Sequence, residues 1–359
     1  MAAFLAIALA LLQAAAAPVA LDPRWVVSFE APPVAPAGFD DATAYIPLKS
    51  GQLVAVDLDR GVVRWALDIA TPYTPATGEG LVFIAAGATI EALDAATGAR
   101  RWSVALPGGA AAPLYWDTGW LLSSSSDGDL SAFRASDGSL IWRQPLGAPL
   151  STAPAPALDR LYLPLADSRL VAVALASGET IWSEALTGPI TELLGLGEQL
   201  VYASSQKFVA SVDVRNGRER WRWRVGGDVA GRPSGDSERI YFASRDNLLR
   251  AVDRRSGNLR WKAVLASRPA GGPLRLPDTV MVPLVSSALS GFDPETGETA
   301  STTTAAGELG SQPFLRPKVR QTRPRLIAIS RDGQLQAFAT RFEPPSAPLA
   351  ELPGAPASP

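Results

Sequence analysis

Aspartate recurs at a regular place in this sequence, and its carboxylate can serve in acid–base chemistry or bind a cation. The recurring positions are Asp57, Asp94, Asp213, Asp253 and Asp293. Each of these aspartates follows an apolar run and precedes a turn glycine. Aspartates so placed commonly accept hydrogen bonds from the backbone of their own turn. We therefore interpret the five as turn-stabilising residues and not as a ring around a ligand.

Histidine and cysteine are absent from the 359 residues. Their absence excludes disulfides, thiolate nucleophiles, Cys/His zinc sites and histidine-based acid–base catalysis. Asp127 and Asp129 flank Gly128, but calcium takes more oxygen ligands than two carboxylates supply, and Asp-Gly favours a hairpin turn. We predict no catalytic residue, no metal site and no bound cofactor, so the protein is not expected to be an enzyme.

Basic side chains form two clusters that are candidates for binding a partner. The first surrounds Trp221 and Trp223 and contains Arg218, Arg220, Arg222 and Arg224. The second, in a proline-containing segment, contains Arg316, Lys318, Arg320, Arg323 and Arg325. Arginine and tryptophan are enriched at interface hot spots. Alternation in the first cluster has the period of a strand with one face in water, so the second cluster is the stronger candidate.

Charge is unevenly distributed along the chain. Residues 1–200 contain ten Lys/Arg and twenty Asp/Glu, whereas residues 201–359 contain twenty-three and fifteen. The two halves of a ring built from this chain would carry opposite net charge, which can orient a charged partner. The sequence pI near 5.5 and the expected export argue against nucleic acid. A protein, or an anionic lipid headgroup, is the expected partner.

A Gly-x-x-x-Trp motif repeats along the chain. Its copies are Gly61/Trp65, Gly98/Trp102, Gly138/Trp142, Gly178/Trp182, Gly217/Trp221 and Gly257/Trp261. A seventh copy has Gly297 but Ser301 in place of the tryptophan. Each repeat also has two short apolar runs and a small residue six positions before the glycine, which indicates a meander of antiparallel strands. About forty residues of sheet cannot bury both faces alone, so the copies must stack.

The ends of the repeat region predict a closed ring. Segment 325–340 repeats the two middle strands of a unit, but no tryptophan-bearing strand follows it. Trp25 lies forty residues before Trp65, so the first strand is expected to complete the last unit. The prediction is an all-β, eight-bladed β-propeller of four-stranded antiparallel blades over residues 21–341. Tryptophans 25, 65, 102, 142, 182, 221 and 261 are expected to pack between blades, each against the small residue of an adjacent sheet.

The two ends of the chain differ from this repeat in composition. Residues 1–20 contain an apolar, alanine-rich stretch that predicts a signal peptide or a retained N-terminal anchor. Residues 342–359 are rich in proline and alanine, which predicts a disordered tail. We expect an exported protein, periplasmic or associated with the cell envelope, that meets a membrane only through an uncleaved N-terminal segment. The sequence leaves the oligomeric state undetermined.

The strings IEALDAATGARRW (residues 90–102) and LRAVDRRSGNLRW (residues 249–261) resemble the pyrroloquinoline quinone (PQQ) repeat. This resemblance covers nearly the whole chain after its N-terminal segment. Eight repeats, expected export and short connections make the chain most similar to BamB-type outer-membrane assembly scaffolds. The resemblance implies a non-catalytic scaffold for protein–protein interaction, although that family is generally lipid-anchored through an N-terminal cysteine that this sequence lacks.

Two other functions remain open at this point. One is a PQQ-dependent dehydrogenase that oxidises an alcohol or a sugar, although such enzymes are longer and have inserted loops that form a cofactor chamber. The other is a propeller whose central channel senses a small molecule.

Overall fold

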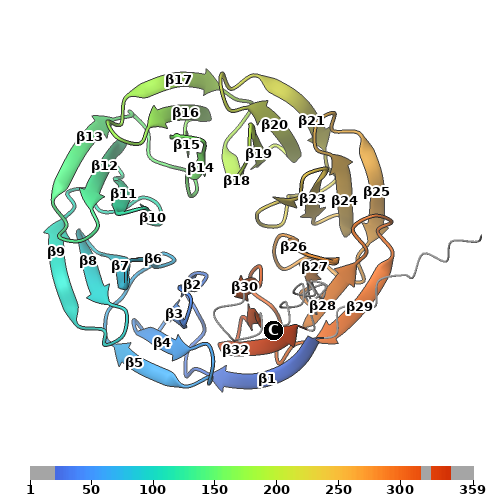
Figure 1. The fold of residues 1–359 in the computed structure, drawn as a ribbon, viewed down its shortest axis with the longest axis horizontal. Helices are drawn as coiled ribbons and strands as arrows, with labels where there is room; N and C mark the ends of the chain where they lie inside the picture. Colours follow the sequence, from blue (N-terminus) through green and yellow to red (C-terminus); the bar gives the residue numbers. More distant parts are fainter. Residues whose placement is uncertain (1–20, 317–324, 341–359) are drawn as a thin grey trace, which may run out of the picture.

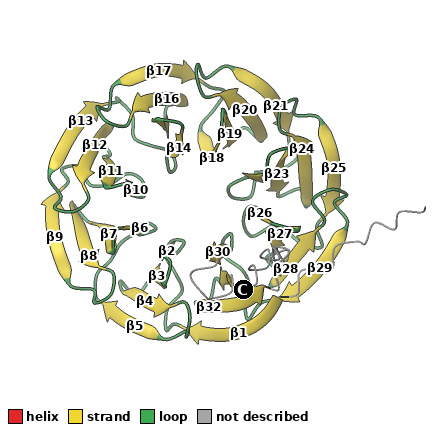
Figure 2. Cartoon of the chain, viewed as in Figure 1, coloured by secondary structure: helices red, strands yellow, loops and turns green. Residues whose placement is uncertain are grey.

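In the computed structural model, which describes residues 21–316 and 325–340, every regular element is a β-strand. The strands form eight four-stranded sheets arranged as blades around a central opening (Figure 1). The described part of the chain contains no helix that could span a membrane, and Figure 2 shows strands joined only by loops and turns. The predicted eight-bladed β-propeller is therefore confirmed.

In the first seven blades the strands follow chain order from the axis outward. Blade one contains β2 (Gly38–Phe39), β3 (Thr43–Pro47), β4 (Leu53–Asp57) and β5 (Val63–Leu67), and blade two contains β6 (Ala76–Gly78), β7 (Leu81–Ala86), β8 (Thr89–Asp94) and β9 (Arg100–Ala105). Blade three contains β10 (Tyr115–Asp117), β11 (Trp120–Ser124), β12 (Asp129–Arg134) and β13 (Leu140–Pro145), and blade four contains β14 (Ala155–Ala157), β15 (Arg160–Pro164), β16 (Arg169–Ala174) and β17 (Thr180–Ala185).

Blades five to eight repeat this arrangement. Blade five contains β18 (Ile190–Leu196), β19 (Gln199–Ser204), β20 (Phe208–Asp213) and β21 (Glu219–Arg224), and blade six contains β22 (Ser234–Gly235), β23 (Arg239–Ser244), β24 (Leu248–Asp253) and β25 (Leu259–Val264). Blade seven contains β26 (Leu274–Leu276), β27 (Thr279–Pro283), β28 (Ala288–Phe292) and β29 (Thr299–Thr304), and blade eight contains β30 (Phe314–Arg316), β31 (Arg325–Ile329), β32 (Gln334–Thr340) and β1 (Leu21–Ser28). In every blade the two middle strands are buried and supply most of the core.

Blade eight is completed from the other end of the chain. Its strand order is β1-β32-β31-β30, and β1 runs antiparallel to β32 from Leu21 opposite Thr340 to Ser28 opposite Gln334. Figure 1 shows the first strand beside the last at the outer rim. The predicted closure of the ring is therefore confirmed.

Each repeat tryptophan contacts two blades, in an arrangement that differs from the predicted one. Trp65 lies opposite Ala55 in the same sheet, so the small residue is on its own blade and not on an adjacent one. The ring reaches the next blade instead, where Gly98 lies directly beneath it. The indole Nε1 of Trp65 donates a hydrogen bond of 3.1 Å to the carbonyl of Ala95. The small residue leaves room for the ring within the sheet, and the glycine leaves room for it across the junction.

The same contacts recur around the ring. Nε1 donates to a carbonyl of the next blade in the pairs Trp102–Ala135, Trp142–Leu175, Trp182–Val214, Trp221–Arg254 and Trp261–Pro294, at 2.9–3.1 Å. The junction between blades seven and eight lacks both partners, because Ser301 replaces the tryptophan and Leu21 replaces the glycine. Leu21 is buried there with Met281, Leu326 and other aliphatic residues, which fill the space of the missing indole.

At the closing junction the indole Nε1 of Trp25 is buried and has no hydrogen-bond partner among the described residues. The carbonyl in the position that the other tryptophans use belongs to Leu58, and Arg325 Nη1 donates to it at 2.6 Å. We predict that Trp102→Phe lowers the free energy of unfolding by about 1 kcal/mol more than Trp25→Phe, because only Trp102 loses a hydrogen bond. Chemical denaturation of both variants measures this difference, and equal losses would contradict the hydrogen-bond argument.

Candidate functional site

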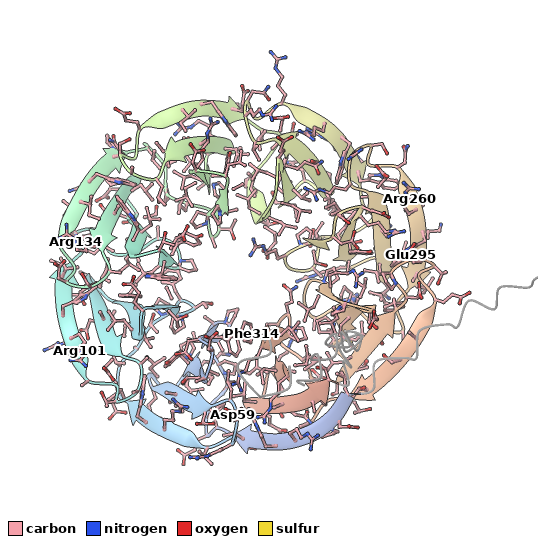
Figure 3. The ribbon with its side chains drawn as sticks, in the orientation of Figure 1. Asp59, Arg101, Arg134, Arg260, Glu295 and Phe314 are labelled. Carbon is pink, nitrogen blue, oxygen red and sulfur yellow. The ribbon has the colours of Figure 1, made fainter. Side chains whose placement is uncertain are left out.

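The recurring aspartates stabilise turns, as predicted. Asp94 Oδ1 accepts hydrogen bonds from the backbone nitrogens of Ala96 and Thr97, and Oδ2 accepts one of 2.6 Å from Arg101. The hydrogen bond from Arg101, together with those from Thr97, lowers the pKa of Asp94 to about 2. The same carboxylate–arginine pair, seven residues apart, occurs as Asp57–Arg64, Asp213–Arg220 and Asp253–Arg260. Two of the arginine partners, Arg101 and Arg260, lie at the outer rim of the ring (Figure 3).

Asp129 forms an ion pair with Arg143, so its carboxylate already has a partner within the same blade. Among the residues that the structure describes, no three acidic side chains converge on a point that could hold a metal ion.

The first basic cluster lies on the outer strand β21 and the turn before it. All four of its arginines, Arg218, Arg220, Arg222 and Arg224, are exposed. Arg220 pairs with Asp213, while Arg222 pairs with Glu219 and stacks 4.4 Å above the ring of Phe208. Within the described residues the guanidinium groups of Arg218 and Arg224 have no ion-pair partner. These two are therefore the cluster members whose charge is free to meet another molecule.

The second basic cluster divides into two parts. Arg316 is only 2% exposed and pairs with Asp59 at 2.7 Å, and Arg325 donates to the carbonyls of Leu58 and Asp59 at 2.6 Å each. Both arginines thus join blade eight to the first blade at Asp59, which Figure 3 labels near the rim. Lys318, Arg320 and Arg323 lie in the segment between them, outside the described residues.

A pocket of about 460 Å³ opens into the central channel. Its wall is made by the innermost segments of blades one, five, six, seven and eight and consists mainly of glycine, alanine and proline. Phe39 of β2 and Phe314 of β30 stack there with centroids 4.1 Å apart and an interplanar angle of 4°, and Figure 3 shows Phe314 beside the opening. Two charged side chains, Glu192 and Arg232, complete the wall.

Glu192 and Arg232 face the channel without an ion pair or hydrogen bond among the described residues. Desolvation raises the pKa of Glu192, although the positive charge of Arg232 acts to lower it. Desolvation lowers the pKa of Arg232, although the charges of Glu192 and Tyr115 act to raise it. Arg232 is nevertheless exposed to solvent and Glu192 partly so, because both stand in an open channel with protein around them.

Sequence reasoning missed these two residues. Each is a single charged residue in a short inner segment, and neither occupies a repeated position of the motif. The sequence offers one signal for them: each is a charged residue within the mostly small and apolar residues that precede or form an innermost strand.

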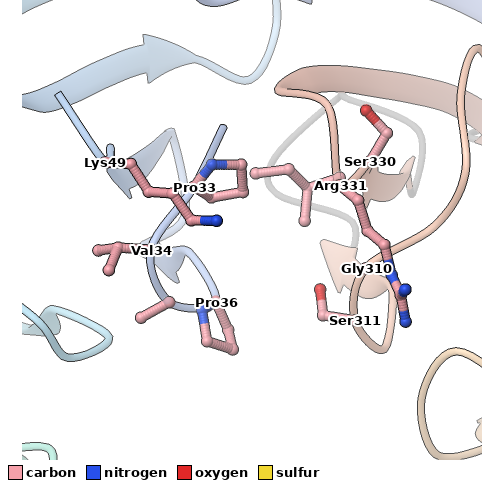
Figure 4. A pocket seen from close by; sticks show the side chains of 10 residues that line it. Pro33, Val34, Pro36, Lys49, Gly310, Ser311, Ser330 and Arg331 are labelled. Carbon is pink, nitrogen blue, oxygen red and sulfur yellow. The ribbon is translucent and has the colours of Figure 1, made fainter. Parts of the chain in front are cut away.

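A second pocket, of about 270 Å³, lies at the closing junction on the other face of the ring from Asp59. Figure 4 shows Lys49 on the side of blade one and Arg331 on the side of blade eight. Neither side chain has an ion-pair partner among residues 21–316 and 325–340. Pro33, Val34 and Pro36 line the same pocket with apolar side chains on the side of blade one. The pocket therefore offers two free cations beside an apolar surface.

Comparisons with known proteins agree with the repeat. Residues 86–210 and 166–344 match a family model described as outer membrane protein assembly factor BamB, and together these matches span more than half of the chain. The curated BamB of Bordetella pertussis is 28% identical over an alignment of 221 residues that covers 55% of this chain and 56% of that protein. The chain spans about half the length of the curated relatives it matches.

Two solved structures share the fold. The BamB of Moraxella catarrhalis superposes with a TM-score of 0.68 at 17% identity, covering 89% of this chain and 100% of that chain. The quinohemoprotein alcohol dehydrogenase of Comamonas testosteroni gives a TM-score of 0.71 at 13% identity, covering 89% and 76%. At these identities the likeness concerns the fold alone.

Proposed function

Because this chain belongs to the family of the outer membrane protein assembly factor BamB, we propose that it is a non-catalytic, exported scaffold. It binds a protein partner in the cell envelope and takes part in outer-membrane protein assembly. The observation that carries the proposal is the family match over residues 86–344 on a closed eight-bladed ring. A ring of interlocked blades holds its loops in fixed positions, which suits a scaffold.

The basic segment between β30 and β31 is the proposed contact. In an antiparallel meander the first and third connections of each blade lie on the same face, so the ends of this segment, Arg316 and Arg325, lie on the face that carries the aspartate turns. Both ends are held on Asp59, so we assign the contact with an acidic partner to Lys318, Arg320 and Arg323. Charge complementarity of this kind accelerates association and depends on ionic strength.

We predict that replacing Lys318, Arg320 and Arg323 together with alanine reduces capture of the partner by the tagged full chain from envelope extract at least several-fold at low salt. The reduction should shrink as salt is raised, because screening already weakens the interaction of the unmodified chain. The double variant Arg218→Ala, Arg224→Ala is the matched control, since it also removes exposed positive charge but at the β21 rim.

Equal loss in the loop variant and the rim control would contradict the assignment of the contact to this segment. The scaffold function itself would be overturned if the chain captured no envelope protein and instead bound PQQ with calcium, detected by quinone absorbance.

A further inference from the structure

We propose that the central channel binds a small zwitterion of the free amino acid class, with its ammonium group at Glu192 and its carboxylate at Arg232. This proposal goes beyond the scaffold function and does not depend on it. The carboxylate and the guanidinium come from neighbouring blades, five and six, and both border the same pocket.

The cavity has the size and the walls of a small-molecule site. Its volume of about 460 Å³ falls within the range of roughly 300–1,000 Å³ that is usual for ligand pockets. Glycines let the blades around it approach closely: a Cβ at Gly272 would lie 2.0 Å from the carbonyl oxygen of Arg232, and a Cβ at Gly271 would lie 2.5 Å from the nitrogen of Gln312. Blades six, seven and eight therefore approach one another through their backbones, and few side chains fill the space in front of them.

Within the part of the chain that the structure describes, the two charged side chains lack ion-pair partners, although such partners are common there. Arg239, Arg250, Arg275 and Arg316, all less exposed than Arg232, each form an ion pair with a carboxylate. Glu192 and Arg232 are near enough for each charge to act on the other, yet they form no contact. Charged side chains that face an open channel without a protein partner are available to a ligand, and such groups concentrate at functional sites.

The pairing of opposite charges selects the class of ligand. A simple anion would be repelled by Glu192, and a simple cation would be repelled by Arg232. A molecule that carries both charges at short separation satisfies both groups through charge-assisted hydrogen bonds. The stacked rings of Phe39 and Phe314 line the same pocket and offer an apolar surface to the side chain of the ligand. L-phenylalanine, which has both charges and an aromatic ring, is therefore the probe of choice.

Isothermal titration of the full chain with three ligands tests the proposal. L-phenylalanine is expected to bind. N-acetyl-L-phenylalanine lacks the ammonium group and L-phenylalaninamide lacks the carboxylate, so each should bind at least about tenfold more weakly, the effect of losing one charge-assisted hydrogen bond. No heat of binding with L-phenylalanine, or equal affinity for all three, would overturn the proposal.

Two variants assign the charges to their residues. Glu192→Gln should abolish the preference for L-phenylalanine over its N-acetyl derivative, and Arg232→Gln should abolish the preference over the amide. Glu198→Gln and Arg218→Gln, which alter exposed residues outside the channel, are the matched controls and should retain both preferences. The proposal would also be overturned if Glu192→Gln and Arg232→Gln retained the preference for L-phenylalanine over both derivatives, as the controls are expected to do. If a channel variant fails to fold, the three-ligand comparison on the unmodified chain still decides.

Discussion

Deletion of residues 1–28 is expected to abolish the cooperative unfolding transition of the propeller. Without β1 the whole length of β32 becomes an unpaired outer edge, and Gly61 loses the indole of Trp25 that covers it. Removing a packed tryptophan alone costs about 3–5 kcal/mol, and the loss of seven paired strand positions adds to it. The sum is comparable to the total stability of about 5–15 kcal/mol of a typical domain. Circular dichroism melts and limited proteolysis measure the outcome.

Two controls accompany this deletion. Removal of residues 342–359, which the sequence predicts to lie outside the propeller, should leave the melting temperature unchanged. A synthetic peptide of residues 19–30 added to the shortened chain should restore a cooperative transition, because it can pair with β32. A shortened chain that melts as sharply and at the same temperature as the full chain would show that closure of the ring by β1 contributes nothing to stability.

The ring was predictable because every blade repeats one solution to the same packing problem. The Gly-x-x-x-Trp spacing fixes an outer strand that begins after a turn, and the offset of Trp25 from Trp65 places the closing strand at the other end of the chain. The prediction that each tryptophan packs against the small residue of an adjacent sheet was wrong for a physical reason. The spacing along the chain shows that a position recurs in each blade, but it does not show which residue lies opposite it. The hydrogen-bond register between strands places Ala55 opposite Trp65 in the same sheet.

The charged residues were less predictable because their partners lie far away in the sequence. Arg316 looks like a loop cation, yet it is buried against Asp59, 257 residues earlier. Glu192 and Arg232 come from different blades and border the same pocket only because the ring brings their innermost segments to one channel. By contrast, the pairs between Asp94 and Arg101 and its equivalents are local, and the turn role of these aspartates could be inferred from the motif.

The glycine of the repeat explains how the blades interlock, and it carries the last prediction. Gly257 has φ +72°, and a Cβ added there would lie 2.6 Å from Cγ of Trp221 in the preceding blade. Gly257→Ala should therefore cost about 1–2 kcal/mol for the left-handed backbone and a further roughly 1–3 kcal/mol for the clash with the ring. Gly80 provides the matched control, because it has φ +74° with nothing within 4 Å of an added Cβ. Gly80→Ala should cost the backbone term alone.

Urea denaturation of the two alanine variants measures the difference, which isolates the packing of one blade against the next. A double variant, Gly257→Ala with Trp221→Leu, should be less unstable than the sum of its two single changes, because the smaller side chain relieves the clash. Equal losses for Gly257→Ala and Gly80→Ala would mean that the junction yields to an added methyl group. The repeat glycine would then be needed only for its backbone conformation, and the tryptophan would not require it as a partner.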